Sequence, residues 1–479
     1  MNHRTLRTTL AASIFFLLAM TSACGQKETY VDTRKPVKLN EVLTNEMSDT
    51  SSLAGLDKKV LNYMQEWRMQ GAQLTIIKND SLVYAKGYGW ADKEKKVEMQ
   101  PSNIMRLASV SKLVTAVGIM VMQEQGLLSL QDTVFGERGI LCDTVYTKAI
   151  KDKNIFKITV EDLLRHKGGF TTRAGDPMFS TRTIMRQNHL KTPPDHETLV
   201  KIVLGRKLDF VPGTSQYYSN FGYLLLSMII EKVSGEPYEK WIQKNVLKPA
   251  NCNDFHIAEN YYKDKYKNEV RYYVPSNEPK VSEYNNSGND VIRCYGGNDI
   301  HALSGAGAWV ASTPELARLI ASIDIRRSVK DIISRESVHQ MVQYFDKDTY
   351  SLGWNDTDPE RGWKRTGTFS GTTALIMYYP DGECWIFASN TSTWKGPSHA
   401  TYTGQLFSEL RRTYSSVLPK RDLFYEDDGS FDPQAYEEQY KKKRIEPPME
   451  KVYSMKEISL GLFEPEDKPA EKGKKNRRK

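Results

Sequence analysis

Two hairpin patterns, one near each end of the globular part of the chain, most strongly limit how it can fold. Each consists of two short apolar runs around residues typical of tight turns, Asn79-Asp80 in the first and Pro380-Asp381-Gly382 in the second. The four runs cover residues 73–78, 81–86, 373–379 and 384–389. Helical apolar patterns occur over residues 56–70, 113–125, 160–165, 222–233 and 314–323. We therefore expect an α+β domain with an antiparallel sheet built from both chain ends, helices on its faces and a mainly helical subregion.

The N-terminus has the pattern of an export signal. Arg4 and Arg7 precede an apolar stretch over residues 10–20, which is too short to cross a bilayer as a folded helix. The stretch ends in Thr21-Ser22-Ala23-Cys24, which resembles a bacterial lipoprotein box, in which the cysteine is lipidated. We therefore expect a lipid anchor at Cys24, in the bacterial cell envelope. Because Gly25 rather than Asp follows the cysteine, analogy with lipoprotein sorting favours the outer membrane over the inner, with the protein facing the periplasm or the surface. An ordinary cleaved leader with a chance cysteine is the alternative.

Composition along the chain indicates where the folded domain lies. In the last 60 residues, 29 are charged, which leaves little to form a core, although aromatic residues such as Phe424 could attach parts of this segment to the domain. We expect a signal peptide at 1–23, a polar tether at 24–52, a folded domain at 53–415, a charged extension at 416–463 and a disordered basic tail at 464–479. The net charge of +8, spread over 479 residues, does not indicate nucleic-acid binding.

Four cysteines remain beyond Cys24. Export permits disulfides, and four cysteines allow three pairings, so buried free thiols and one structural bridge both stay open. Their scattered spacing does not suggest a metal site. The four are Cys142, Cys252, Cys294 and Cys384.

The first motif with chemical meaning is Ser-x-x-Lys at Ser109 and Lys112. Three residues apart at a helix start, the two side chains share one face, so the amine can reach the hydroxyl and activate it as a nucleophile. The pattern occurs again at Ser392 and Lys395, among Thr, Gly and Pro residues. Only the first copy leads into a helix that is apolar on all sides, over residues 113–122, so we choose Ser109; a helix-capping serine is the alternative.

The second motif is Tyr-x-Asn at Tyr218 and Asn220, just before the buried helix expected at 222–233. A phenol and an amide two residues apart project to the same side and can flank a nucleophile. Cationic neighbours such as Lys112 would lower the pKa of the phenol enough for it to act as a base. The same spacing at Tyr284 and Asn286 lies in a loop rich in Ser, Asn and Gly, and we regard it as incidental.

These motifs resemble those of the serine β-lactamase and penicillin-binding protein superfamily, in the branch of class C β-lactamases, DD-peptidases and related esterases. In that family a basic residue-x-Gly on a strand comes third, and the matching residues here are Arg365 and Gly367. The resemblance covers about residues 53–414. Further matching phrases lie at residues 105–112, 126–132, 158–166 and 210–213.

The third motif departs from the family, which usually has Lys or His where this chain has Arg365. His166-Lys167-Gly168 fits the literal pattern, but it precedes Tyr218 and belongs to a phrase that the family keeps separate. An arginine retains the charge that a substrate carboxylate or a tyrosinate would need, and it could hold the carboxylate in a two-pronged grip.

The resemblance implies acyl transfer without a metal or organic cofactor. Ser109 would attack a carbonyl, Lys112 and Tyr218 would move the proton, and the backbone N–H groups of Ser109 and Thr368 would form the oxyanion hole. The expected substrates are small molecules or peptidoglycan-derived peptides with a peptide, ester or lactam carbonyl. The alternative is a lipoprotein that binds peptidoglycan or a partner on this fold without turnover. The sequence leaves the choice of substrate and the oligomeric state open.

Overall fold

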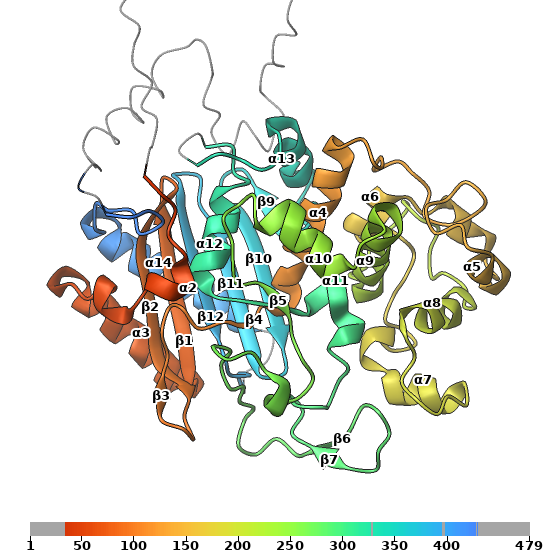
Figure 1. Cartoon of the computed structure of the whole chain (residues 1–479), viewed down its shortest axis with the longest axis horizontal. Coiled ribbons are helices and arrows are strands. Elements are labelled where there is room, and N and C mark those ends of the chain that lie inside the picture. The colour runs from red at the N-terminus through yellow and green to blue at the C-terminus, as the bar shows by residue number, and fades with distance from the viewer. Residues whose placement is uncertain (1–33, 327–328, 395–397, 428, 430–479) are drawn as a thin grey trace, which may run out of the picture. The chain divides into compact units, whose positions relative to one another are not determined.

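The computed structural model describes residues 34–326, 329–394, 398–427 and 429, and the elements below lie in the compact unit that starts at Pro36. A seven-stranded antiparallel sheet has the strand order β3-β2-β1-β12-β11-β10-β9 (Figure 1). The strands are β1 (Gly71–Lys78), β2 (Ser81–Asp92), β3 (Val97–Glu98), β9 (Asp356–Asp358), β10 (Gly362–Phe369), β11 (Thr372–Tyr378) and β12 (Glu383–Ser389).

Both expected hairpins are present and they meet in the middle of the sheet. Strand β1 pairs with β12, for example Leu74 with Phe387, so the two ends of the domain form one sheet. In the first turn Asn79 and Asp80 have positive φ angles of 50° and 62°, which suit the twist of a two-residue hairpin. The second turn ends in Gly382, also at positive φ. The α+β architecture predicted from the sequence is confirmed.

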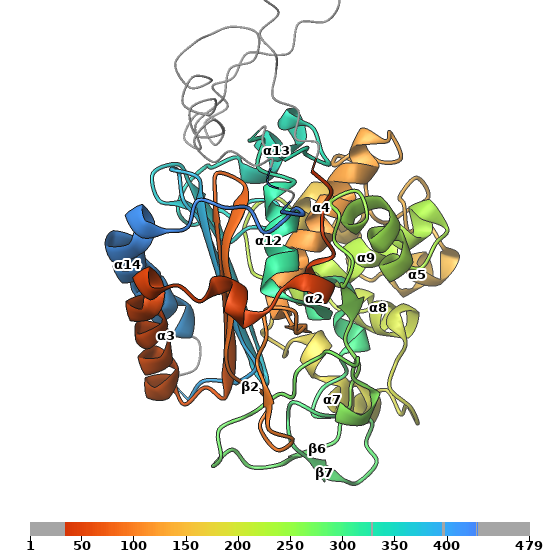
Figure 2. The same ribbon diagram turned by 60° about the vertical axis from the view of Figure 1, so that its left-hand side comes forward.

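Helices cover both faces of the sheet (Figure 2). On the outer face, α3 (Ala54–Trp67) and α14 (His399–Tyr414) bury apolar side chains such as Trp67 and Phe407 against the strands. On the inner face, α12 (Thr313–Ala321) begins against β1, where the Thr313 N–H donates to Gln73 Oε1 (3.0 Å). The alternation of side chains along β1 thus separates an apolar outer surface from a partly polar inner one.

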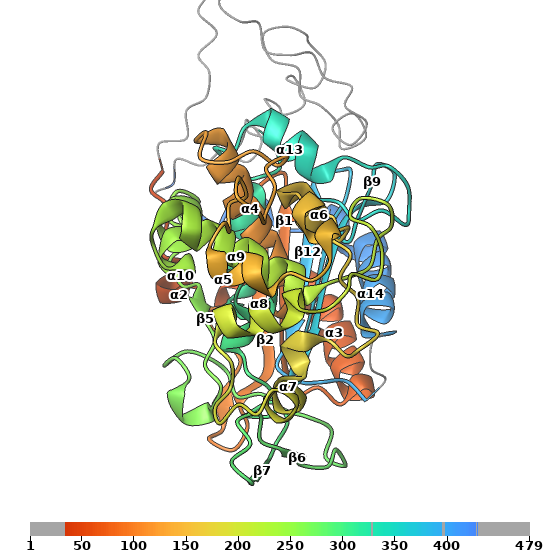
Figure 3. The same cartoon turned by 90° about the vertical axis from the view of Figure 1, so that its right-hand side faces the viewer.

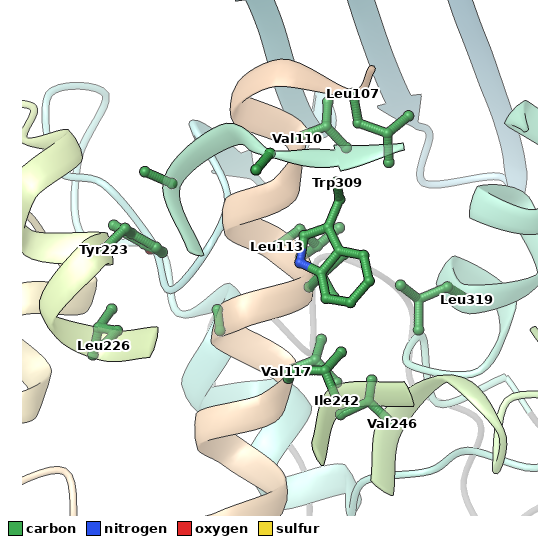
Figure 4. Packing of buried hydrophobic residues seen from close by; sticks show 14 of the residues in the cluster. Leu107, Val110, Leu113, Val117, Tyr223, Leu226, Ile242, Val246, Trp309 and Leu319 are labelled. Atoms are coloured by element: carbon green, nitrogen blue, oxygen red, sulfur yellow. The ribbon is translucent and has the colours of Figure 1, made fainter. Parts of the chain in front are cut away.

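The apolar helix predicted after Ser109 is α4 (Ser111–Glu124), and it is buried on all sides. It packs on α9 (Asn220–Ser234), α10 (Tyr238–Ile242) and α11 (Ser304–Gly307). Figure 4 shows Trp309 of β8 (Trp309–Ala311) between α4 and α12. Because α4 is the centre of the core, the residues at its N-terminus have a rigid support.

A mainly helical subregion lies in front of the sheet in Figure 3. It contains α5 (Thr144–Ala149), α6 (Val160–Leu164), α7 (Thr181–Gln187) and α8 (His196–Leu204). The remaining elements are α2 (Leu39–Val42), α13 (Arg335–Val342), β4 (Met105–Arg106), β5 (His256–Ile257), β6 (Val281–Ser282) and β7 (Asp290–Val291), together with short 3₁₀ and π turns. None of the helices in the described ranges is both long and apolar enough to cross a membrane.

The tether expected over residues 24–52 is wrong for its second half. Leu39 of α2 is fully buried in the main core, and the Val37 N–H donates to the carbonyl oxygen of Phe424 (3.0 Å). Arg318 of α12 donates to the carbonyl oxygens of both Val37 (2.7 Å) and Phe424 (2.6 Å). The polar composition concealed these few apolar anchors, which attach both ends of the domain to one another. The signal peptide, Cys24, most of the C-terminal extension and the basic tail lie outside the described residues.

The four cysteines described by the structure are free thiols, three of them buried and Cys142 exposed. Of the two possibilities that the sequence left open, the structure therefore contains the free thiols.

Candidate active site

Ser109 lies in a 3₁₀ turn, η3 (Ala108–Val110), that leads directly into α4. Ala108, the residue before it, has a positive φ angle of 47°, a conformation that is uncommon for a residue with a side chain. One turn later Lys112 is fully buried, with its Nζ 3.3 Å from Ser109 Oγ. Ser109 and Lys112 thus share one side of the helix, as the spacing predicts.

The Lys112 amine has three oxygen acceptors. Besides Ser109 Oγ, its Nζ donates to Asn220 Oδ1 (2.7 Å) and to the carbonyl oxygen of Ala306 (2.6 Å). An ammonium group has three N–H donors, so these acceptors satisfy all of them. The contacts favour the protonated lysine even though the group is buried.

Tyr218 lies just before α9, whose start is capped by the Ser219 hydroxyl accepting from the Gly222 N–H (3.1 Å). The Tyr218 hydroxyl donates to Ser109 Oγ at 2.7 Å. Its ring packs on the imidazole of His166, with ring centroids 4.6 Å apart. The cap and the ring contact fix the phenol beside the serine.

The electrostatics of the site shift three pKa values. Burial, reinforced by the charge of Arg365 and opposed by Tyr218, lowers the pKa of Lys112 to about 8. Burial would raise the pKa of Tyr218, but the charges of Lys112 and Arg365 outweigh it and lower that pKa to about 8. Burial and the same two charges lower the pKa of His166 well below its usual range, so its ring is neutral. A phenol that ionises near neutral pH next to a serine is suited to take its proton.

Arg365 of β10 is fully buried, and its guanidinium points at the backbone of Ser109. Its Nε donates to the carbonyl oxygen of Ser109 (2.8 Å), and Nη2 donates to the same oxygen. The expected stabilisation of the Tyr218 phenolate by the charge of Arg365 agrees with the lowered pKa of the phenol. The expected two-pronged grip on a substrate carboxylate is wrong in this structure, because the guanidinium is buried and turned toward Ser109.

Gly367 allows β10 to approach the serine closely. A Cβ atom at this position would lie 2.3 Å from the carbonyl oxygen of Leu107 and 3.2 Å from the Ser109 nitrogen, so any side chain would push the strand away. Thr368, the next residue, is exposed near the end of β10. The oxyanion hole at the N–H groups of Ser109 and Thr368 stays a prediction.

The alternative motif copies lie elsewhere. The Ser392 hydroxyl accepts from the Gly371 N–H (2.5 Å), and Lys395 lies outside the described residues. Tyr284 accepts a hydrogen bond from Asn260 (2.9 Å) in a loop that also contains Asn286. Neither of these hydrogen bonds involves Ser109 or Tyr218.

Sequence reasoning missed Asp176 and assigned no role to His166. The Asn220 amide nitrogen donates to Asp176 Oδ2 at 2.7 Å, and the Ser219 N–H donates to His166 Nδ1 at 3.1 Å. An Asp before Pro177 signals a helix cap, which Asp176 also is, but no local pattern indicates that it reaches Asn220.

A cavity of about 820 Å³ opens beside Tyr218. Tyr217, Tyr350 and Thr366 line it together with Tyr218, so it is bounded by β10 and by the loops before α9 and β9. Its wall is mainly polar and aromatic, a lining suited to a small molecule or peptide. Among the residues that the structure describes, no group of three or more His, Cys, Asp or Glu side chains is placed to hold a metal ion.

Comparisons with known proteins show which proteins this chain resembles. Protein flp of Staphylococcus aureus (strain COL) is 24% identical over 328 residues, 68% of this chain and 60% of that protein. The chain thus spans about 60% of the length of the curated relatives it matches first.

Two solved structures have a similar fold. The octameric penicillin-binding protein homologue from Pyrococcus abyssi has a TM-score of 0.55 and 24% identity, over 82% of this chain and 81% of that chain. The D-amino acid amidase from Ochrobactrum anthropi SV3, complexed with L-phenylalanine amide, has a TM-score of 0.57 and 15% identity, over 76% and 99% of the two chains. These likenesses support the fold. The model of the family described as Beta-lactamase matches residues 56–406, most of the chain, and the chain therefore belongs to the Beta-lactamase family.

Proposed function

We propose that the protein is an exported, lipid-anchored serine hydrolase of the class C-related type, which acts through an acyl-enzyme on Ser109. The observation that carries this proposal is the 2.7 Å hydrogen bond between the Tyr218 hydroxyl and Ser109 Oγ, beside a buried lysine. A nucleophile, a base of matched pKa and a cation next to that base are the parts that acyl transfer needs.

Tyr218 is the better candidate for the base. Lys112 is held as an ammonium by its three oxygen acceptors, so it has no free electron pair to take a proton. Tyr218, with a pKa of about 8, is partly a phenolate at neutral pH. Lys112 then acts by stabilising that phenolate.

The proposed reaction follows from these roles. Ser109 Oγ bonds to the carbonyl carbon while its proton passes to Tyr218, and the carbonyl oxygen becomes an oxyanion facing the N–H groups of Ser109 and Thr368. The oxyanion collapses, the bond to the leaving group breaks, and Tyr218 returns the proton to that group. A water then attacks the acyl carbon while the Tyr218 phenolate takes one of its protons. The bond from that carbon to Ser109 Oγ breaks, Tyr218 returns the proton to Oγ, and the acid leaves.

Substrate choice is proposed only as a class. A peptide, amide, ester or lactam carbonyl fits the acyl chemistry, and the name of the structurally similar D-amino acid amidase is consistent with an amide. A screen of purified protein against one substrate of each type would rank them.

The lipid anchor is proposed from the Cys24 motif, and the outer membrane as its place from the residue that follows. Cys24→Ser should give a protein that takes up no alkyne fatty acid during metabolic labelling and leaves the membrane fraction or stays uncleaved. A wild-type chain that is unlabelled and begins at another residue would disprove this part.

Active-site labelling tests the enzyme. A fluorescent fluorophosphonate should label the wild-type protein and the Ser392→Ala variant equally, and Ser109→Ala not at all. Labelling of Ser109→Ala at the wild-type rate would refute the assignment, and an unreactive wild type would favour binding without turnover.

A further inference from the structure

Asp176 contacts the candidate site through the side chain of Asn220, whose amide can be oriented in two ways. It precedes the 3₁₀ turn η5 (Pro177–Phe179), and its two carboxylate oxygens have different partners. Oδ1 accepts from the Met178 N–H (2.9 Å), which caps the turn, and Oδ2 accepts from Asn220 Nδ2 (2.7 Å). One carboxylate thus joins the loop before α7 to the start of α9.

An asparagine amide can be turned in two ways, with its oxygen or its nitrogen toward a given neighbour. In this structure the Asn220 oxygen faces the Lys112 ammonium at 2.7 Å and its nitrogen faces Asp176. The reverse orientation would place an N–H donor against the ammonium and an oxygen against the carboxylate, which is unfavourable at both ends. Asp176 therefore selects the one orientation in which Asn220 accepts from Lys112.

We propose that Asp176 is a positioning residue, which holds the Asn220 amide and thereby keeps Lys112 charged beside Tyr218. This inference rests on the proposed function, because it concerns how the base of that reaction is maintained. Asp176 contacts neither Ser109 nor Tyr218 by hydrogen bond in the described structure; it acts through Asn220.

Two further observations agree with this role. Asp176 is among the groups that raise the pKa of Lys112 against the dominant effect of burial, so its charge also favours the ammonium. The turn that carries Asp176 is also attached to β10, because the ring of Phe179 lies 5.9 Å from that of Phe369. The loop is thus held at both sides of the site, and the carboxylate is not a freely moving surface group.

Titration of Tyr218 tests the proposal without any substrate. Among the described tyrosines with a shifted pKa, Tyr218 is the only one whose pKa is lowered, so it should be the first phenol to ionise. The difference in ultraviolet absorbance between the full-length protein and its Tyr218→Phe variant isolates this phenolate.

In the structure, Met178 and Asn220 donate to different oxygens of the Asp176 carboxylate. Asp176→Asn replaces one of these oxygens with an NH₂ group, which cannot accept a hydrogen bond, so one of the two bonds is lost together with the negative charge. We expect the Tyr218 titration to move to higher pH. If the pKa of Tyr218 rises by about one unit, the phenolate fraction at neutral pH falls about tenfold. The rate at which a neutral fluorophosphonate labels Ser109 should fall by the same factor. Asp209→Asn is the matched control. Asp176 and Asp209 both line a second cavity of about 140 Å³, but Asp209 accepts from Thr171 and makes no hydrogen bond with Asn220 in the described structure.

A double-mutant cycle separates positioning from a general loss of structure. If Asp176 acts through Asn220, then Asp176→Asn should slow labelling much less in an Asn220→Ala background than in the wild type. Equal effects in both backgrounds, or a Tyr218 titration in Asp176→Asn that matches Asp209→Asn, would overturn the proposal. If the fluorophosphonate labels no form of the protein, the proposed function fails, whereas the Tyr218 titration still decides whether Asp176 controls the phenol.

Discussion

Replacing Arg365 with glutamine removes a positive charge that reaches Ser109 from strand β10. The guanidinium is fully buried, and it donates to the Ser109 carbonyl oxygen through two nitrogens. The same charge is one of two that lower the pKa of Tyr218. The substitution should therefore change both the stability of the turn and the ionisation of the base.

The magnitude follows from these contacts. Losing a charge-assisted hydrogen bond costs about 1.5 to 3 kcal/mol, so the free energy of unfolding of Arg365→Gln should fall by about that amount. With a pKa of about 8, Tyr218 is roughly one-tenth phenolate at pH 7. If the pKa rises by about one unit, the fraction falls to roughly one-hundredth and the rate of acylation at pH 7 falls about tenfold.

The assay is the pH dependence of kcat/KM for one neutral and one carboxylate-bearing substrate of equal size. Arg365→Gln should shift the rising limb of the pH profile to higher pH. It should lower kcat/KM for both substrates by the same factor, because the buried guanidinium does not face the substrate. Arg365→Lys retains the charge but can place fewer N–H groups on the Ser109 carbonyl, so it should restore the pH profile and only part of the stability. A wild-type pH profile in Arg365→Gln would refute this reasoning, and a loss confined to the carboxylate substrate would restore the two-pronged grip.

Three further outcomes are expected. Ser109→Ala should abolish acylation while changing the free energy of unfolding in urea by no more than about 2 kcal/mol, because the half-buried hydroxyl adds little to packing. Gly367→Ala should reduce both acylation and stability, the latter by about 1 to 3 kcal/mol, whereas Gly404→Ala, with nothing within 4 Å of the added methyl group, should leave acylation unchanged. The free energy of unfolding should fall as the pH rises from about 4 to about 8, because burial and a neighbouring carboxylate raise the pKa of Asp331 to about 8 and also raise that of Asp80. The folded protein is more stable while these carboxyl groups are protonated. Asp331→Asn should therefore make the free energy of unfolding less dependent on pH, as measured by urea unfolding at several pH values.

Much of the fold could be predicted because its signals are local. The turn at Asn79-Asp80 and the all-round apolar pattern of α4 each depend on a few consecutive residues. The buried α2 could not be predicted in the same way, since Leu39 and Leu43 are isolated apolar residues in a polar segment and their partners, such as α12, lie far along the chain.

Some features of the candidate site could likewise be predicted from local sequence, and others could not. The spacing of Ser109 and Lys112 already predicts that their side chains share one helix face. The spacing of Tyr218 and Asn220 likewise predicts that their side chains project to the same side of one loop. Their distance to one another, 2.7 Å from the Tyr218 hydroxyl to Ser109 Oγ, depends on how α9 packs against α4. The periodicity of one helix or strand predicts the direction in which its side chains point. The distance between side chains on two different elements depends on how those elements pack.

Arg365 and Asp176 show most clearly what only the tertiary structure decided. The sequence by itself determined that a positive charge precedes Gly367 on a strand, and it places an Asp directly before Pro177. Whether the guanidinium would face the substrate or the Ser109 carbonyl depended on the pleat and on the close approach at Gly367. Whether the Asp176 carboxylate would reach Asn220 depended on the path of a loop across the helical subregion. Both are contacts between residues far apart in the chain, and their geometry is set by the packed core rather than by any local preference.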